Sequence, residues 1–288
     1  MLLSKVRPRT RKLWDGTPES GYAKRPDPAS SPNGDEVLRV LITRPEPGAA
    51  RTADRLRSLG HEPVMLPLTR TVGRRDGLLR LDAQEAGAFA ATSGAAIRHW
   101  REVGIAPGRL QTTFYAVGTA TGKVAMQAGF SAVRRGSADA AALASTIVAD
   151  YRSGRLPVTQ SKPLVYLAGS TRKNTFEADL AAASVPFRTI EIYEIEIISH
   201  STDYLQNVFV DDPVDAVLFY STVAASCFFD VAAGAKFDKA LNNINYICMG
   251  SSILAAIPEA FIAQSAVAEQ PDEPSLFQLL DRIAQDKI

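Results

Sequence analysis

The sequence predicts an α/β protein built from two similar lobes, and three observations carry this prediction. Short apolar segments of strand length alternate with amphipathic segments of helix length from Val37 to the C-terminus. Such alternation is typical of parallel sheets whose strands are connected by helices. A strand–turn–helix pattern also occurs twice along the chain, with similar spacing. Apolar residues make up 46% and charged residues 22% of the 288 residues, as in ordinary globular proteins large enough for two domains.

The regular elements begin only after a basic, Pro-rich segment, residues 1–36. This composition cannot bury a core, so we expect a disordered extension. Residues 37–45 then predict a strand, and residues 48–60 predict an amphipathic helix that ends at a glycine. Residues 62–68 predict a second short strand. Further strands are expected in the segments 86–93, 112–118, 131–135, 163–169, 187–197, 215–221, 244–250 and 263–270.

The internal repeat is clearest in four segments. Residues 86–100 resemble residues 214–229, because in each an apolar strand ends in a small hydroxyl residue and an Ala-rich helix begins. Each is followed by a second strand–turn–helix unit, at 115–130 and 247–261 respectively. A duplication of this kind predicts two similar lobes that face one another, with a ligand cleft between them.

Turns rich in Ser, Thr and Gly follow the repeated strands. In open parallel sheets, ligands bind beyond the carboxyl ends of the strands, where helix N-termini attract anions. For any single turn helix capping is the favoured explanation, but the recurrence of such turns at equivalent places indicates a shared anion site. Arg44, at another strand end, is either a loop cation or a clamp for a substrate carboxylate. The candidate turn residues are Thr92, Ser93, Gly118, Thr119, Thr121, Gly169, Ser170, Ser221, Gly250, Ser251 and Ser252.

Several function classes fit the sequence poorly. The net charge of +1 gives no electrostatic footprint for nucleic acid, and no apolar segment reaches membrane-spanning length. The turn at 118–122 lacks the spacing of a nucleotide-binding loop, and the three histidines are scattered. The two cysteines, Cys227 and Cys248, lie in apolar segments and are expected as buried thiols of a cytoplasmic protein. We therefore expect chemistry without a metal or a covalent intermediate.

Five segments, in this order, resemble the uroporphyrinogen-III synthase family, and the resemblance extends from Val37 to the C-terminus. They are "LITRPEPGAARTADRLRSLGHEPVMLPL", "AATSGAAI", "AVGTATGKVAMQAGF", "IEIYEI" and "CMGSSILAAI". The resemblance implies two three-layer α/β lobes joined by a two-stranded linker. One domain would hold residues 37–70 plus 197–288, and the other residues 71–196.

The resemblance also implies an activity. Members of this family are cofactor-independent lyases of tetrapyrrole and haem biosynthesis. They cyclise the linear tetrapyrrole hydroxymethylbilane to uroporphyrinogen III, inverting ring D and losing water. The eight carboxylates of this substrate suit the predicted turns, and the resemblance implies a monomer that makes at most transient contact with the preceding pathway enzyme. The alternative function is a non-catalytic bilobed sensor for a polyanionic tetrapyrrole.

Tyr193 is the expected catalytic acid. Its strand pattern alone indicates a packing residue, but it matches the tyrosine in the cleft of the family. Two positions depart from the family pattern. Ala95 replaces a common asparagine, and Ile253 replaces a common threonine.

Overall fold

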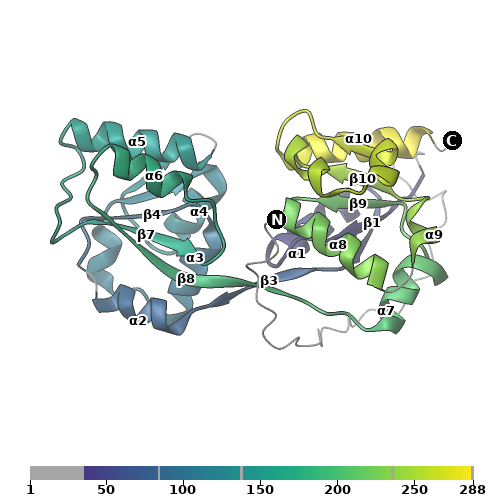
Figure 1. Ribbon diagram of the computed structural model, residues 1–288, viewed down its shortest axis with the longest axis horizontal. Coiled ribbons are helices and arrows are strands. Elements are labelled where there is room, and N and C mark those ends of the chain that lie inside the picture. Colours follow the sequence, from purple (N-terminus) through teal and green to yellow (C-terminus); the bar gives the residue numbers. More distant parts are fainter. Residues whose placement is uncertain (1–35, 84, 137–138, 235–236, 287–288) are drawn as a thin grey trace. The chain divides into compact units, whose positions relative to one another are not determined.

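The computed structural model describes residues 36–83, 85–136, 139–234 and 237–286. Apart from Glu36, the extension expected at residues 1–36 therefore lies outside the described part. Within the described residues the chain divides into two compact units: Thr71–Glu196 forms one, and residues 36–70 form the other together with residues 197–286. Each unit contains one sheet with helices on both of its faces, as the sequence predicted (Figure 1).

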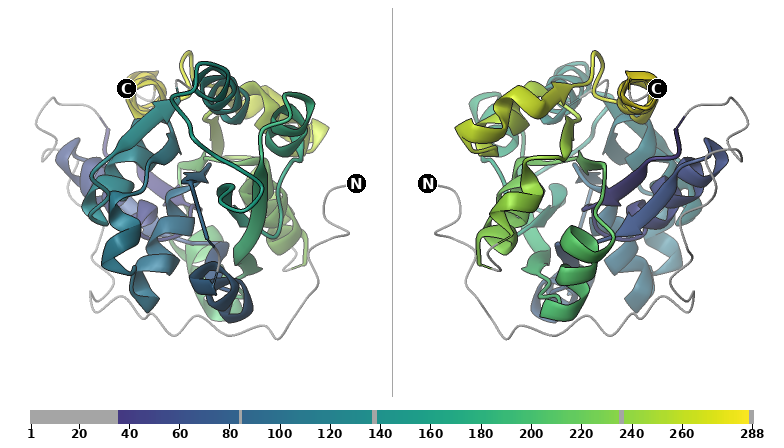
Figure 2. Two further views of the ribbon diagram at one scale, coloured as in Figure 1. Left: turned by 90° about the vertical axis from the view of Figure 1, so that its left-hand side faces the viewer. Right: turned by 90° about the vertical axis from the view of Figure 1, so that its right-hand side faces the viewer.

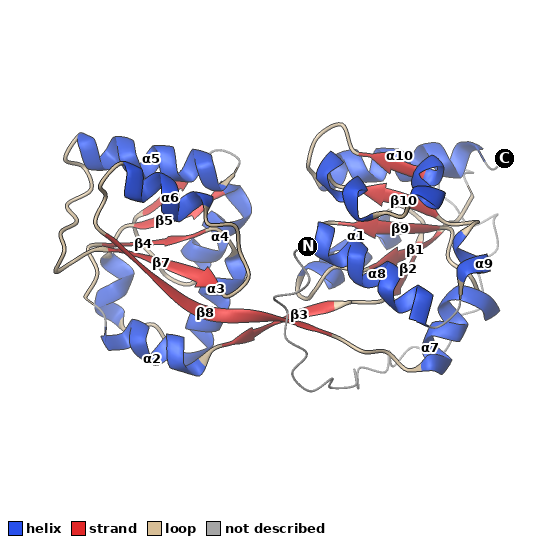
Figure 3. Ribbon diagram, in the orientation of Figure 1, coloured by secondary structure: helices blue, strands red, loops and turns tan. Residues whose placement is uncertain are grey.

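The chain passes between the units through two neighbouring strands. These are β3 (Thr69–Gly73) and β8 (Phe187–Ile197), which are adjacent in the sheet order and form the predicted two-stranded linker (Figure 3). Arg74 N–H donates to the carbonyl of Ile192 (2.8 Å), and Ile198 N–H donates to that of Leu68 (2.9 Å). Because the partners run in opposite directions along the chain, this strand pair is antiparallel.

The unit containing the N-terminal strands has a parallel five-stranded sheet in the order β2–β1–β9–β10–β11. In β1, Val40 and Ile42 face the core under α1 and α10, while Leu41 faces the core under α8. This alternation follows from the two-residue period of a strand buried on both faces. The strands are β1 (Arg39–Ile42), β2 (Glu62–Met65), β9 (Ala216–Phe219), β10 (Asn245–Cys248) and β11 (Ser265–Val267). The main helices are α1 (Gly48–Ser58), α7 (Thr202–Gln206), α8 (Thr222–Gly234), α9 (Asp238–Leu241) and α10 (Glu273–Asp286).

The second unit has a six-stranded sheet in the order β3–β8–β7–β4–β5–β6, and its strands from β8 to β6 are parallel. Helices α2, α3 and α4 pack on one face and α5 and α6 on the other (Figures 1 and 2). The remaining strands are β4 (Ala88–Ala91), β5 (Phe114–Val117), β6 (Val133–Gly136) and β7 (Leu164–Gly169). The helices are α2 (Arg75–Ala83), α3 (Gly94–Val103), α4 (Gly118–Gln127), α5 (Ala140–Arg152) and α6 (Thr175–Ala182).

The two sheets share one topology, which accounts for the repeat in the sequence. The strand order β2–β1–β9–β10–β11 corresponds to β8–β7–β4–β5–β6. In both, the first two strands are joined by one helix, α1 or α6, and the other three follow one another along the chain. Both cysteines are buried thiols, as predicted.

One predicted helix is wrong. Residues 247–261 were expected to continue from a strand into a single helix, but β10 is followed by two short 3-10 helices, Ser251–Ala256 and Glu259–Gln264. Pro258 separates them, because proline lacks an N–H donor and holds the preceding Ile257 in extended backbone (ψ 127°).

Candidate active site

The predicted residues of the six-stranded unit lie along one edge of its sheet. Thr92 and Ser93 follow β4, Gly118 follows β5, and Ser170 follows β7. These three strands are parallel neighbours, so their carboxyl ends meet at the same edge. We call this row of turns the β4–β5–β7 edge. It is the place where open parallel sheets bind ligands.

Tyr193 on β8 belongs to the same edge, because β8 pairs with β7. Tyr193 lies opposite Gly169 at a register irregularity, and the N–H of Ser170 donates to the carbonyl of Tyr193 (2.9 Å). The phenol lies so close to Gly169 that a Cβ there would be 2.7 Å from Cζ and 2.9 Å from the hydroxyl of Tyr193. Its ring stacks on His99 of α3, with centroids 6.1 Å apart. Gly169 and His99 therefore fix the position of this phenol.

The surroundings of Tyr193 keep its hydroxyl protonated at neutral pH. Burial raises the pKa of Tyr193 above its usual value, while a hydrogen bond with Ser93 and the positive charges of Arg98 and Arg172 oppose that rise. A phenol in this state is available as a hydrogen-bond or proton donor. The two guanidinium groups would also stabilise a phenolate formed transiently during a reaction.

Ser93 has two roles at this edge. Besides its hydrogen bond with Tyr193, its Oγ accepts from the N–H of Ala95 (3.2 Å) and so caps α3. The capping interpretation of this serine is therefore confirmed, while its contact with an anion stays a prediction. Nearby, the hydroxyls of Thr92 and Tyr166 are 2.8 Å apart, which ties the end of β4 to β7.

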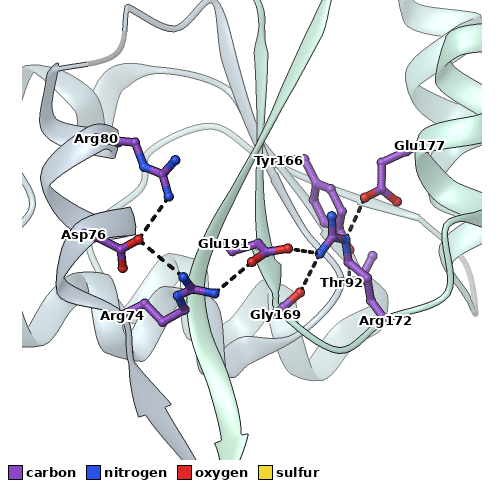
Figure 4. A network of polar contacts seen from close by, with 9 residues as sticks. All are labelled: Arg74, Asp76, Arg80, Thr92, Tyr166, Gly169, Arg172, Glu177 and Glu191. Atoms are coloured by element: carbon purple, nitrogen blue, oxygen red, sulfur yellow. Dashed lines mark hydrogen bonds and ion pairs between the residues drawn. The ribbon is translucent and has the colours of Figure 1, made fainter. Parts of the chain in front are cut away.

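A chain of ion pairs supports the turn after β7 (Figure 4). Arg172 donates to the carbonyl of Gly169 (2.9 Å), to Glu191 (2.9 Å) and to Glu177 of α6 (2.7 Å). Glu191 also accepts from Arg74 (2.9 Å). Arg172 thus holds the backbone beneath Tyr193 in place, and half-buried carboxylates on both sides fix the guanidinium.

This chain of ion pairs was not predicted from the sequence. Arg172 is three residues after Gly169, and this short spacing was a usable signal. Glu191 is two residues before Tyr193, but the register irregularity places it on the opposite face of β8 from the phenol. No sequence signal indicated the contact of Arg74 with Glu191, because 117 positions separate the two residues.

The turn after β5 starts α4 without a capping side chain. Gly118 opens the helix in left-handed backbone (φ 59°), and Val117 at the N-cap position makes no side-chain hydrogen bond to it. Thr119 is exposed, whereas Thr121 is buried on the inner side of the helix. The predicted contact of this turn with an anion is therefore best served by Thr119 and the first-turn N–H groups.

The predicted residues of the five-stranded unit also share one edge. Arg44 follows β1, Ser221 follows β9, and Gly250 and Ser251 follow β10. Ser221 caps α8 by accepting from the N–H of Ala224 (3.2 Å). The hydroxyl of Thr222 and the carbonyl of Ser252 are 3.4 Å apart, which links the turns after β9 and β10. Arg44 is ion-paired with Glu273 (2.7 Å).

Among the described residues, no group of three or more His, Cys, Asp or Glu side chains is arranged to hold a metal ion. Within the same residues, no helix is long and apolar enough to cross a membrane.

Comparison with known proteins identifies the family. The family model for uroporphyrinogen-III synthase HemD matches residues 50–278. The structure of uroporphyrinogen-III synthetase from Helicobacter pylori resembles this one with a TM-score of 0.58 and 15% identity, over 86% of this chain and 100% of that chain. A mutant uroporphyrinogen III synthase from the extremely thermophilic bacterium Thermus thermophilus has a TM-score of 0.50 and 18% identity, over 88% of this chain and 100% of that one. No curated protein sequence matches the chain. Since the family model covers well over half of its length, this chain belongs to the uroporphyrinogen-III synthase family.

Proposed function

We propose that this chain is a uroporphyrinogen-III synthase, a lyase that cyclises hydroxymethylbilane with inversion of ring D and loss of water. The family match supports the reaction. The observation that carries the mechanism is the position of Tyr193, a protonated phenol fixed against Gly169 on the β4–β5–β7 edge. Helix N-termini and hydroxyl-rich turns at the same edge suit a substrate with carboxylate arms.

Binding and orientation would supply most of the catalysis. The carboxylates of the substrate would bind at the carboxyl edges of the two sheets, through Ser and Thr hydroxyls and first-turn N–H groups. Holding the two ends of a flexible chain in reacting geometry can lower a barrier by about 7–11 kcal/mol in favourable cases. It would also disfavour the uninverted closure that occurs in water.

Tyr193 would act as the general acid. Its phenol protonates the terminal hydroxyl of hydroxymethylbilane, which leaves as water and yields a cationic, protonated azafulvene. The methylene carbon from which the water left is then attacked by ring D, through the substituted position of that ring. The resulting spirocyclic intermediate fragments and recloses with ring D inverted. The proton lost from the pyrrole at the final closure would restore the phenol. Arg98 and Arg172 would stabilise the phenolate in the interval.

The test is the isomer composition of the product. Purified protein is incubated with enzymatically prepared hydroxymethylbilane, and the oxidised products are separated by chromatography. We expect the type III isomer to form faster than the spontaneous type I isomer. Formation of type I alone, at the uncatalysed rate, would refute the proposal, and tight tetrapyrrole binding without turnover would favour the sensor function instead.

We propose further that the enzyme needs no cofactor and acts as a monomer in the cytoplasm, as the family resemblance implies. The catalytic groups named above are all side chains of the protein. Activity should therefore survive gel filtration in the presence of a chelator, and should elute at the position of a single chain. Loss of activity that a dialysate restores would contradict the proposed independence from cofactors.

A further inference from the structure

Three donors converge on one carboxylate oxygen in the five-stranded unit. Oε1 of Glu273 accepts from Arg44 Nη1 (2.7 Å), the Thr52 hydroxyl (2.6 Å) and the Tyr220 hydroxyl (2.8 Å). We call Arg44, Thr52 and Tyr220 the Arg44 cluster. Its members come from the segment after β1, from α1 and from the end of β9.

The Arg44 cluster is held in place by contacts other than those to Glu273. The guanidinium carbon of Arg44 lies 4.0 Å from the centroid of the Tyr220 ring. Arg44 also packs on Gly48, where a Cβ would be 2.5 Å from its Nε. Thr52 is fully buried, and its hydroxyl is 3.3 Å from both Arg44 Nη1 and the Tyr220 hydroxyl. The donors would therefore stay together if the carboxylate left.

Tyr220 also stays a donor under ordinary conditions. Burial raises the pKa of its hydroxyl, and the negative charge of Glu273 raises it further. The cluster therefore presents one cation and two neutral hydroxyl donors, a set suited to a carboxylate.

Glu273 belongs to a more exposed part of the chain than the buried Thr52 does. It is the first residue of α10 and follows an exposed segment, residues 269–272. Its side chain is 33% exposed. The carboxylate could leave by a rearrangement of this segment and the first turn of α10, with no change in β1, α1 or β9.

The location of the cluster connects it with the substrate. Arg44 and Tyr220 follow the carboxyl ends of β1 and β9, and Ser221, a predicted substrate-binding residue, is next to Tyr220. The carboxylate of Glu273 is the same chemical group as the acetate and propionate arms of the substrate.

We propose that Arg44, Thr52 and Tyr220 form a binding site for a carboxylate arm of the substrate, and that Glu273 occupies this site until the arm displaces it. The inference rests on the proposed function. A side chain of the protein that competes for the site reduces the apparent affinity for the substrate. The intrinsic affinity is multiplied by the fraction of molecules in which the site is open. Removing the carboxylate of Glu273 should therefore strengthen binding. If Glu273 only anchors α10, the same change should weaken binding or leave it unaltered.

The experiment measures binding of uroporphyrin III, a stable macrocycle with eight carboxylates, by fluorescence titration, together with KM for hydroxymethylbilane. In Glu273→Gln and Glu273→Ala we expect Kd and KM to fall by about 3–10-fold relative to the unaltered protein. Glu273→Gln removes the charge but keeps the size of the side chain and one acceptor oxygen, so it decides the matter if Glu273→Ala is poorly folded. Thermal melting monitors the fold of each variant.

Two further variants make the result specific. Glu269→Gln removes an exposed carboxylate four residues away, which pairs only distantly with Arg282 (3.6 Å), and should change nothing. In Arg44→Ala, adding Glu273→Ala should no longer strengthen binding, because the shared site is gone. Unchanged or weaker binding in both single Glu273 variants would overturn the inference while leaving the proposed function intact. Failure of the unaltered protein to form the type III isomer would instead overturn the proposed function.

Discussion

Tyr193 owes its proposed role to a single hydroxyl group. Replacing it by Phe keeps the ring against Gly169 and His99 and removes only the hydrogen bond with Ser93. We expect Tyr193→Phe to lower kcat for the type III isomer by about 10²–10⁴-fold, the usual contribution of a general acid. The melting temperature should change little.

Tyr166→Phe is the matched control for this variant. It removes a phenol that is hydrogen-bonded to Thr92 on the same sheet edge, and we expect a much smaller effect on kcat. An unchanged rate in Tyr193→Phe would remove Tyr193 from the mechanism.

Gly169 provides a second test of the position of the phenol. The methyl group of Gly169→Ala would be 2.7 Å from Cζ of Tyr193, so the ring must move. We expect a lower kcat, together with a loss of about 1–3 kcal/mol in the free energy of unfolding, as is usual for overpacking. Kinetics and denaturant unfolding measure the two effects. In Gly108→Ala the added methyl group has no neighbour within 4 Å, so kcat should be unaffected; equal losses in both variants would contradict the assigned contact.

Asp150 on α5 connects three elements of the six-stranded unit. It accepts from Tyr115 of β5 (2.8 Å), from Arg134 of β6 (2.9 Å) and from Arg155 (2.8 Å), and it is 3% exposed. Burial alone would raise the pKa of Asp150. The hydrogen bonds from Arg155 and Tyr115, with the charges of Arg134 and Arg155, lower it overall below the ordinary value of 3.8.

This depressed pKa predicts a pH dependence. A carboxyl group with a lower pKa in the folded state stabilises the fold above its unfolded pKa, and the contribution is lost as the pH falls through the folded pKa. We expect Asp150→Asn to lower the free energy of unfolding by about 1–3 kcal/mol at pH 7, as for lost hydrogen bonds to a charged group. The difference should shrink as the pH falls below 3.8. Denaturant titrations at several pH values measure it, and a pH-independent difference would contradict this explanation.

The strands and turns of the site could be predicted from sequence because each depends on a short segment. The apolar run before Ser93 predicts a buried strand, and the small hydroxyl residue at its end predicts the cap found on α3. The helix expected after Gly250 was wrong because Pro258, within the same segment, interrupts it.

Contacts between distant segments could not be predicted. Arg44 was recognised as a candidate cation, but its partner Glu273 is 229 positions away and nothing in either segment specifies the pairing. The role of Tyr193 came from family resemblance, since its strand pattern alone indicates packing. The extension expected at the N-terminus lies outside the described residues, apart from Glu36, and the proposed substrate contacts of both edges stay predictions.

Each unit has its own pair of hydrophobic cores, one on each face of its sheet. We therefore expect a cavity in one unit to destabilise that unit selectively. Phe228 is fully buried between α8 and the five-stranded sheet, and Phe228→Ala should cost about 3–5 kcal/mol there. Native-state hydrogen exchange should show lower protection in β1, β9 and β10 and little change in β4, β5 and β7. Equal loss in both sheets would mean that the units unfold together.

The chain enters and leaves the six-stranded unit through β3 and β8, and this affects how the protein could exchange parts by recombination. The unit Thr71–Glu196 is one uninterrupted stretch of sequence. Its two ends are neighbours, because both crossings lie on the adjacent strands β3 and β8. A single continuous stretch of coding sequence therefore specifies it, between the two stretches that specify the five-stranded unit. Recombination could exchange that segment with one from a relative as a single cassette, leaving the host sheet with its own strands in their original order.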